Sequence, residues 1–325
     1  MKTLARIALA IPLVVVALFW VGALYFAGPR PQALSTALAL GYLLGTIALF
    51  VFLRPFRRAV VVYAVVFAAL FAWWETLLPS NSRDWAPEVA RLPWAEIEGD
   101  RLVVHDLRNF DYRSETDFTP RYEERGYDLS KLVGVDIFMS YWGSPAIAHT
   151  ILSWQFEDMP PLAISIETRR DKTQQYSAVR GFFKQYTIYY VVADERDLVR
   201  LRTNYRGEDV YLYRLTVPAD RAKAVLLDYF ATINDLRERP RWYNALTQNC
   251  TTTIRMHARH IGDRAPFDWR LIVNGYGDQM LYERGRVDTS LPFAELRERS
   301  NVVARAKAAD PRGAAGSACG QGRAG

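Results

Sequence analysis

The chain has little cysteine and little histidine, two and four residues respectively among 325. Two cysteines exclude a dense disulfide framework, although a single bridge between Cys250 and Cys319 stays open. The four histidines limit the choice of a general base for a nucleophilic enzyme. The sequence also lacks a nucleic-acid-binding motif. Its formal charge of +6 comes largely from arginines that flank apolar segments and from a basic tail, so no nucleic-acid partner is expected.

Three long apolar runs follow one another at the N-terminus, at residues 5–27, 33–53 and 59–78. Each has about 20 residues and almost no charge, which is enough to cross a hydrocarbon core of about 30 Å. Lysine and arginine residues precede the first run and separate the second from the third, so the positive-inside rule places both flanks in the cytoplasm. We therefore expect residues 1–78 to form a three-helix transmembrane bundle with the rest of the chain on the far side.

The remainder of the chain is predicted to be an α+β domain between two irregular segments. Prolines and serines interrupt residues 79–98, which indicates a juxtamembrane linker. Residues 304–325 are rich in glycine and alanine toward their end, which predicts a disordered tail. Between them, residues 99–303 contain runs typical of strands, at 102–107, 133–141, 148–156, 162–169, 186–192 and 209–215, and an amphipathic helix at about 219–237.

Cys250 is placed where a helix is predicted to begin. Thr247 and Asn249 can cap free backbone N–H groups, and apolar residues continue with helical spacing toward Gly262. The positive end of a helix dipole favours the thiolate, which is the nucleophilic form of cysteine. Cys250 is therefore a candidate nucleophile. The alternative is a small buried hydrophobic residue, a common fate of free cysteine.

A predicted hairpin supplies a candidate base and a residue to orient it. The runs 148–156 and 162–169 are separated by a short turn with two prolines, so His149 would face the neighbourhood of Glu167. A carboxylate beside an imidazole can hold its tautomer and stabilise its charged form. We expect His149 to be the base and Glu167 its orienting partner, unless Glu167 instead pairs with Arg169 or Arg170 on an exposed strand.

Residues 169–184 form a basic and aromatic segment. Arg169 and Tyr176 of this segment are candidate substrate contacts, and the segment as a whole is either a surface for anionic lipid headgroups or a solvated loop.

His257 and His260 share a predicted helix with Cys250 but have no acidic partner at a zinc spacing, so no metal site is expected.

Several separated blocks resemble one bacterial family. The blocks 142–150, 164–169, 176–213 and 243–253 are similar, in the same order, to the Lnb N-terminal periplasmic domain. The succession of His149, a polar residue on the next strand, and Asn249 with Cys250 on a helix also resembles the permuted papain-like fold of lecithin:retinol acyltransferase relatives. That second resemblance implies a small antiparallel sheet packed on helices.

The resemblance implies a chemistry for these residues. It makes Cys250 the nucleophile and His149 the base, with Glu167 in the third position by analogy of place; Asn249 or Gln248 would help the Cys250 N–H to bind an oxyanion. The family implies transfer of an acyl chain, through a thioester, from a membrane lipid to a lipoprotein or peptide amine, without a cofactor. We expect a multi-pass protein of the bacterial inner membrane that acts in the periplasm as a thiol acyltransferase. A thiol amidase or peptidase of the envelope and a non-catalytic binding module are the alternatives.

Overall fold

The computed structural model describes residues 2–310, with side chains from residue 11 onward, and divides into two compact units. One unit contains residues 1–80 together with the segments 175–187 and 242–245. The other contains residues 81–174, 188–241 and 246–325. Two internal segments of the predicted domain therefore group with the N-terminal helices, a division that the sequence did not indicate.

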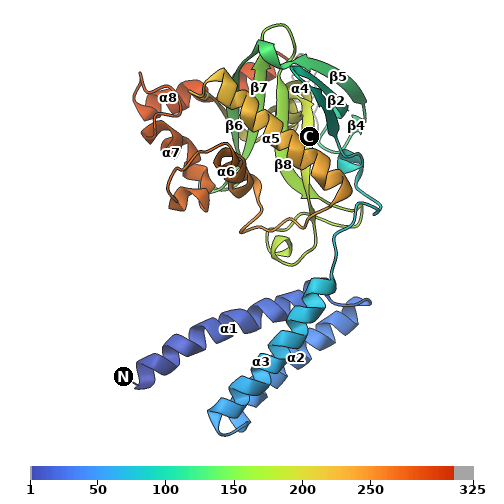
Figure 1. Cartoon of the computed structure of the whole chain (residues 1–325), viewed down its shortest axis with the longest axis vertical. Helices are drawn as coiled ribbons and strands as arrows, with labels where there is room; N and C mark the ends of the chain where they lie inside the picture. The colour runs from blue at the N-terminus through green and yellow to red at the C-terminus, as the bar shows by residue number, and fades with distance from the viewer. Residues whose placement is uncertain (1, 311–325) are drawn as a thin grey trace, which may run out of the picture. The chain divides into compact units, whose positions relative to one another are not determined.

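The first unit is built from the helices α1 (Lys2–Ala27), α2 (Gln32–Phe52) and α3 (Phe56–Thr76) (Figure 1). α2 and α3 are both long and apolar enough to cross a membrane, whereas the described apolar part of α1 runs from Ile11 to Ala27. Two of the three predicted spans thus meet the length and composition expected of a transmembrane helix. The first span stays a prediction.

Phe183 connects the segment 175–187 to these helices. Its ring belongs to a cluster with Trp20 and Ala23 and stacks on Phe26 with ring centroids 5.2 Å apart. It also lies against Gly22, where an added Cβ would come within 2.3 Å of the Phe183 ring. Gly22 therefore leaves the space that the aromatic ring fills, as small residues do between packed apolar helices.

The second unit contains an eight-stranded sheet. Its strands lie in the order β1-β2-β9-β8-β7-β6-β10, with β5 paired to β2, and a two-stranded sheet of β3 and β4 lies apart. The bounds are β1 (Trp94–Glu98), β2 (Arg101–Arg108), β3 (Asp111–Tyr112), β4 (Phe118–Thr119), β5 (Tyr122–Asp128), β6 (Leu132–Tyr141), β7 (Ala148–Phe156), β8 (Leu162–Arg169), β9 (Thr187–Asp194) and β10 (Asp209–Arg214).

Most of the described strand pairs are antiparallel, as predicted, but β2 and β9 run parallel where Arg108 meets Ala193. The sheet is therefore mixed, which corrects the expectation of an antiparallel sheet. The reason is that β9 joins the sheet beside a strand from far earlier in the chain, and such a pairing need not follow hairpin geometry.

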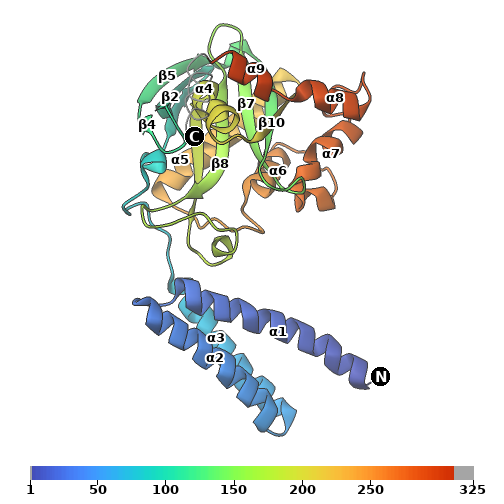
Figure 2. The same cartoon turned by 180° about the vertical axis from the view of Figure 1, so that it is seen from behind.

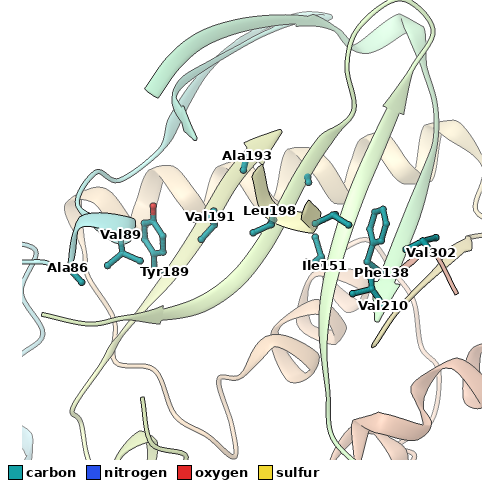
Figure 3. Close-up of a cluster of buried hydrophobic side chains, with 12 residues drawn as sticks. Ala86, Val89, Phe138, Ile151, Tyr189, Val191, Ala193, Leu198, Val210 and Val302 are labelled. Carbon is teal, nitrogen blue, oxygen red and sulfur yellow. The ribbon is translucent and has the colours of Figure 1, made fainter. Parts of the chain in front are cut away.

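Helices and loops cover both faces of the sheet. α5 (Ala219–Glu238) crosses one face (Figure 1). On this face the Trp154 indole donates to the Ala222 carbonyl at 2.9 Å. The other face is covered by α4 (Glu195–Arg200) and α9 (Val303–Ala308) (Figure 2). There, Ile151 and Val191 of the strands meet Leu198 of α4 in a buried cluster (Figure 3). The domain is thus a sheet between helical layers, in agreement with the α+β prediction.

Two segments predicted to be irregular contain regular structure. β1 lies within residues 79–98 and pairs with β2 through Trp94 and His105. α9 begins at Val303 and overlaps the predicted tail, and Asp310 after it accepts a hydrogen bond from Asn204 at 3.1 Å. Partners distant in sequence therefore order these residues of the predicted linker and tail, and the rest of the predicted tail, residues 311–325, lies outside the described residues. The helices α6 (Cys250–His260), α7 (Gly277–Glu283) and α8 (Phe293–Ser300) complete the domain.

Candidate thiol site

Cys250 is the first residue of α6, as its sequence context predicted. Asn249 is the N-cap: its side chain accepts from the Thr252 N–H at 3.0 Å, and Thr252 Oγ1 accepts from the Asn249 N–H at 3.0 Å. This reciprocal pair is a capping box, which fixes the start of the helix. The Cys250 thiol is half-buried and forms no disulfide with any described residue. Cys319 lies outside the described residues, so a bridge to it stays untested.

Asn274 joins Cys250 to the beginning of strand β7. Its Nδ2 lies 4.0 Å from Cys250 Sγ and donates to Thr251 Oγ1 at 2.6 Å. The same amide group donates to the Ala148 carbonyl at 2.6 Å and accepts from the Ala148 N–H at 3.0 Å. A single buried side chain therefore holds the start of α6 against the residue that precedes His149. The sequence analysis missed Asn274, because it lies in an irregular segment with no periodicity to distinguish it.

His149 and Glu167 lie together, as the predicted hairpin required, and Ser165 lies between them. His149 Nε2 is 2.6 Å from Ser165 Oγ, which donates to Glu167 Oε1 at 2.9 Å. The nitrogen and the carboxylate oxygen are 3.7 Å apart. Because the Ser165 hydroxyl donates its proton to Glu167, its oxygen accepts from His149. Nε2 of His149 therefore carries the ring proton, and Nδ1 carries the lone pair. Ser165 was also missed, although it shares a strand face with Glu167 by the two-residue period.

Arg202 influences the protonation states of both His149 and Glu167. Arg202 donates to Glu167 at 3.0 Å and to Glu208 at 3.0 Å, and Glu208 also pairs with Ser140. Burial alone would raise the pKa of Glu167, but Arg202 and His149 lower it to about 2. Burial, together with Arg202, lowers the pKa of His149 to about 3 despite the nearby carboxylate. At neutral pH the pair is therefore a neutral imidazole beside a carboxylate.

Cys250 and His149 approach β7 from different sides. His149 shares its strand face with Ile151, which packs under α4. α6 packs on the opposite face, where His257 Nε2 lies 2.7 Å from the Tyr190 hydroxyl. No described hydrogen bond joins Cys250 Sγ to His149. Alternation along the strand directs the His149 ring away from the body of α6, and its role as the base for Cys250 stays a prediction.

The weaker candidates have other surroundings. Gln248 lines a small cavity beside Tyr190 and Met256. Arg169 is buried and donates to the carbonyls of Val89 and Ala90 at 2.9 and 2.7 Å.

Through these two hydrogen bonds, Arg169 holds the segment that precedes strand β1 in place. Burial lowers the pKa of Arg169 to about 10. Tyr176 is exposed and belongs to the unit of the apolar helices. A substrate role for either residue, and an oxyanion role for Asn249 or Gln248, stay predictions.

The remaining histidines have carboxylate partners. His105 lies 2.9 Å from Glu124 and stacks on Trp94, as a structural histidine would. His257 and His260 both face Asp228 of α5, with Nδ1 to Oδ2 distances of 2.6 and 3.0 Å.

Asp228 is the acidic partner that the sequence did not reveal, because it lies on a different helix. The three ligand atoms lie within 4.8 Å of one another. A shared tetrahedral metal would hold its ligand atoms about 3.3 Å apart. The 2.6 Å separation is instead that of a hydrogen bond.

Comparison with known proteins gives one family. No curated protein and no solved structure matches the chain significantly. Residues 118–275 match the model of the Lnb N-terminal periplasmic domain, and this range contains Cys250, His149, Glu167 and Asn274. The matched part is 158 of the 325 residues, and over this part the chain is similar to a family whose name places its domain in the periplasm.

Proposed function

We propose that the protein is a membrane-anchored thiol acyltransferase of the cell envelope, with Cys250 as the acyl-carrying residue. The observation that carries the proposal is the position of the free, half-buried Cys250 at the first turn of α6, with the Asn274 amide 4.0 Å from its sulfur. Backbone N–H groups at a helix start favour a thiolate and can bind an oxyanion. The apolar helices α2 and α3 support a donor that resides in the membrane.

The proposed reaction has two steps. In the first, the Cys250 sulfur attacks the ester carbonyl of a lipid while a base takes the thiol proton. The carbon–oxygen bond breaks, the leaving alcohol receives that proton, and an S-acyl enzyme remains. In the second, an amine attacks the thioester, the carbon–sulfur bond breaks, and the amine proton returns to the thiolate. No redox partner is required, and a thioester remains reactive enough toward an amine.

His149 is the proposed base, although its ring lies on the other face of the strand. Its Nδ1 carries the lone pair and accepts no hydrogen bond from a described residue, and Asn274 binds the preceding residue. The other three histidines are held by Glu124 or by Asp228. Proton transfer therefore requires the thiol and Nδ1 to meet at the beginning of β7, directly or through one water.

An assay with full-length protein in phospholipid vesicles tests the proposal. The vesicles contain a phospholipid with a labelled acyl chain, and a peptide with a free amino terminus is added. A transferase gives a labelled amide that is lost in Cys250→Ala and kept in the control His105→Gln.

Labelled fatty acid without amide would favour the hydrolase alternative. If Cys250→Ala formed as much labelled amide as the wild type, a thioester on Cys250 would be excluded.

A further inference from the structure

An exposed apolar surface surrounds the segment that carries Asn274. Among the described residues of the sheet domain, nine large apolar side chains are exposed, and six of them lie in the two segments 142–147 and 267–276. They are Trp142, Ile147, Phe267, Trp269, Ile272 and Tyr276. Exposed fractions reach 63% for Phe267 and 61% for Ile272. Such a concentration on one part of a domain is typical of an interaction surface.

The two segments are in direct contact. The Gly275 N–H donates to the Ala146 carbonyl at 2.9 Å. An added Cβ on Gly275 would lie 2.1 Å from the Pro145 carbonyl oxygen, so only glycine permits this approach. Trp269 packs on Tyr276 with ring centroids 5.7 Å apart. The two segments that carry the six side chains therefore lie side by side, and Asn274 holds the second segment beside Cys250.

The charge next to this surface is positive. Residues 255–276 contain four arginines and two aspartates. Asp263 and Asp268 are engaged by Arg286 and Arg270, whereas Arg255, Arg259 and Arg264 have no carboxylate partner among the described residues. Arg255 instead lies over the Phe267 ring at 5.8 Å. Aromatic residues mixed with free arginines suit the interface of an anionic phospholipid bilayer, where rings lie at headgroup level and cations pair with phosphate.

We propose that these two segments bind the surface of the bilayer in which the chain is anchored, with Trp269 and Ile272 inserted at the level of the headgroups and upper acyl chains. A bilayer is the occupant that fits, because the same polypeptide carries two helices able to span one. A tethered surface meets the lipid at high effective concentration, so a modest apolar area is sufficient. The inference deepens the proposed function, since it assigns the surface on which Cys250 would meet a lipid acyl donor.

Photo-crosslinking of the full chain in nanodiscs tests this inference without measuring activity. Trp269→p-benzoylphenylalanine and Ile272→p-benzoylphenylalanine are compared with the same replacement of Ile97, an exposed apolar residue on β1. Replacement of Leu44 in α2 is the positive control for lipid contact. After irradiation, the peptides around positions 269 and 272 are expected to gain the mass of one phospholipid, and the peptide around position 97 is not.

The composition of the nanodisc gives a second readout. Adding phosphatidylglycerol to phosphatidylcholine should increase the adduct at position 269, and Arg259→Gln with Arg264→Gln should abolish that increase. Adducts only at position 44, equal adducts at 97 and 269, or crosslinks from 269 to a second copy of the chain would overturn the proposal. If the lipid adducts form but Cys250→Ala still makes as much labelled amide as the wild type, the surface stands and the proposed thioester is excluded. An acylated Cys250 without these adducts would support the transferase and overturn the surface.

Discussion

Asn274 Nδ2 lies 4.0 Å from the sulfur of Cys250, and the same amide forms hydrogen bonds to Thr251 and to both backbone groups of Ala148. One side chain thus positions the first turn of a helix against the first residue of a strand. The residues it joins are 102 positions apart (250 − 148).

Asn274→Ala should destabilise the domain by about 2–4 kcal/mol, because it leaves buried backbone groups of Ala148 without partners. Thr251→Val removes only one of these hydrogen bonds and should cost about 1 kcal/mol. Urea unfolding of the purified protein, followed by intrinsic fluorescence, measures both. Equal effects of the two variants would contradict the bridging role.

Two buried tyrosines near His257 differ in their hydrogen bonding, so removing each hydroxyl gives a pair of variants to compare. The Tyr190 hydroxyl lies 2.7 Å from His257 Nε2, whereas the buried Tyr229 hydroxyl has no hydrogen-bond partner among the described residues. Tyr190→Phe should therefore cost about 1–2 kcal/mol, and Tyr229→Phe should leave stability unchanged or increase it slightly. Thermal unfolding of the two variants decides this. A larger loss in Tyr229→Phe would mean that its hydroxyl has a partner.

Acidification should weaken the fold through its histidines. The pKa values of His149 and His257 are lowered by burial to about 3 and about 4, from an ordinary value of about 6.5. Between these values and pH 6.5 the unfolded chain binds more protons than the folded one. The free energy of unfolding therefore falls as pH falls, by about 1.4 kcal/mol per pH unit for each proton by which the two states differ. The lowered pKa of Glu167 adds to the loss between about pH 4.5 and 2.

The variant His149→Gln isolates one of these contributions. Between pH 6 and pH 4.5 it should lose about half of the pH dependence, because His257 still titrates. Denaturant unfolding at several pH values measures the slope. An unchanged slope would show that His149 is not held in its neutral form by the fold.

The membrane topology can be tested on the helices α2 and α3. Arg57 and Arg58 lie at the beginning of α3, so the turn between the helices should be cytoplasmic and the sheet domain periplasmic. Alkaline phosphatase fused after residue 310 should be active, and the same enzyme fused at residue 54 should be inactive. The opposite pattern would reverse the orientation.

Much of the domain could be predicted because its patterns are local. β7 and β8 alternate or run apolar between turn residues, and α5 places Leu226, Tyr229 and Ile233 on one buried face. The hairpin predicted that His149 faces the neighbourhood of Glu167, and the structure places His149 Nε2 3.7 Å from Glu167 Oε1. The start of α6 at Cys250 followed from its capping residues.

What the sequence did not reveal depends on contacts between distant segments. The parallel pairing of β2 with β9, the Asp228 partner of two histidines, and the Asn274 bridge each join segments separated by irregular chain. Alternation gives a side chain its face, but only tertiary packing decides which helix covers that face.

The intact mass of the detergent-solubilised protein tests the central claim most directly. Wild type and Cys250→Ala are compared before and after neutral hydroxylamine, which cleaves thioesters, and after incubation with phospholipid. The account predicts a hydroxylamine-sensitive addition of fatty-acid size in the wild type alone. An addition of the same size and hydroxylamine sensitivity that persists in Cys250→Ala would place the acyl group on another residue and contradict an acyl thioester on Cys250.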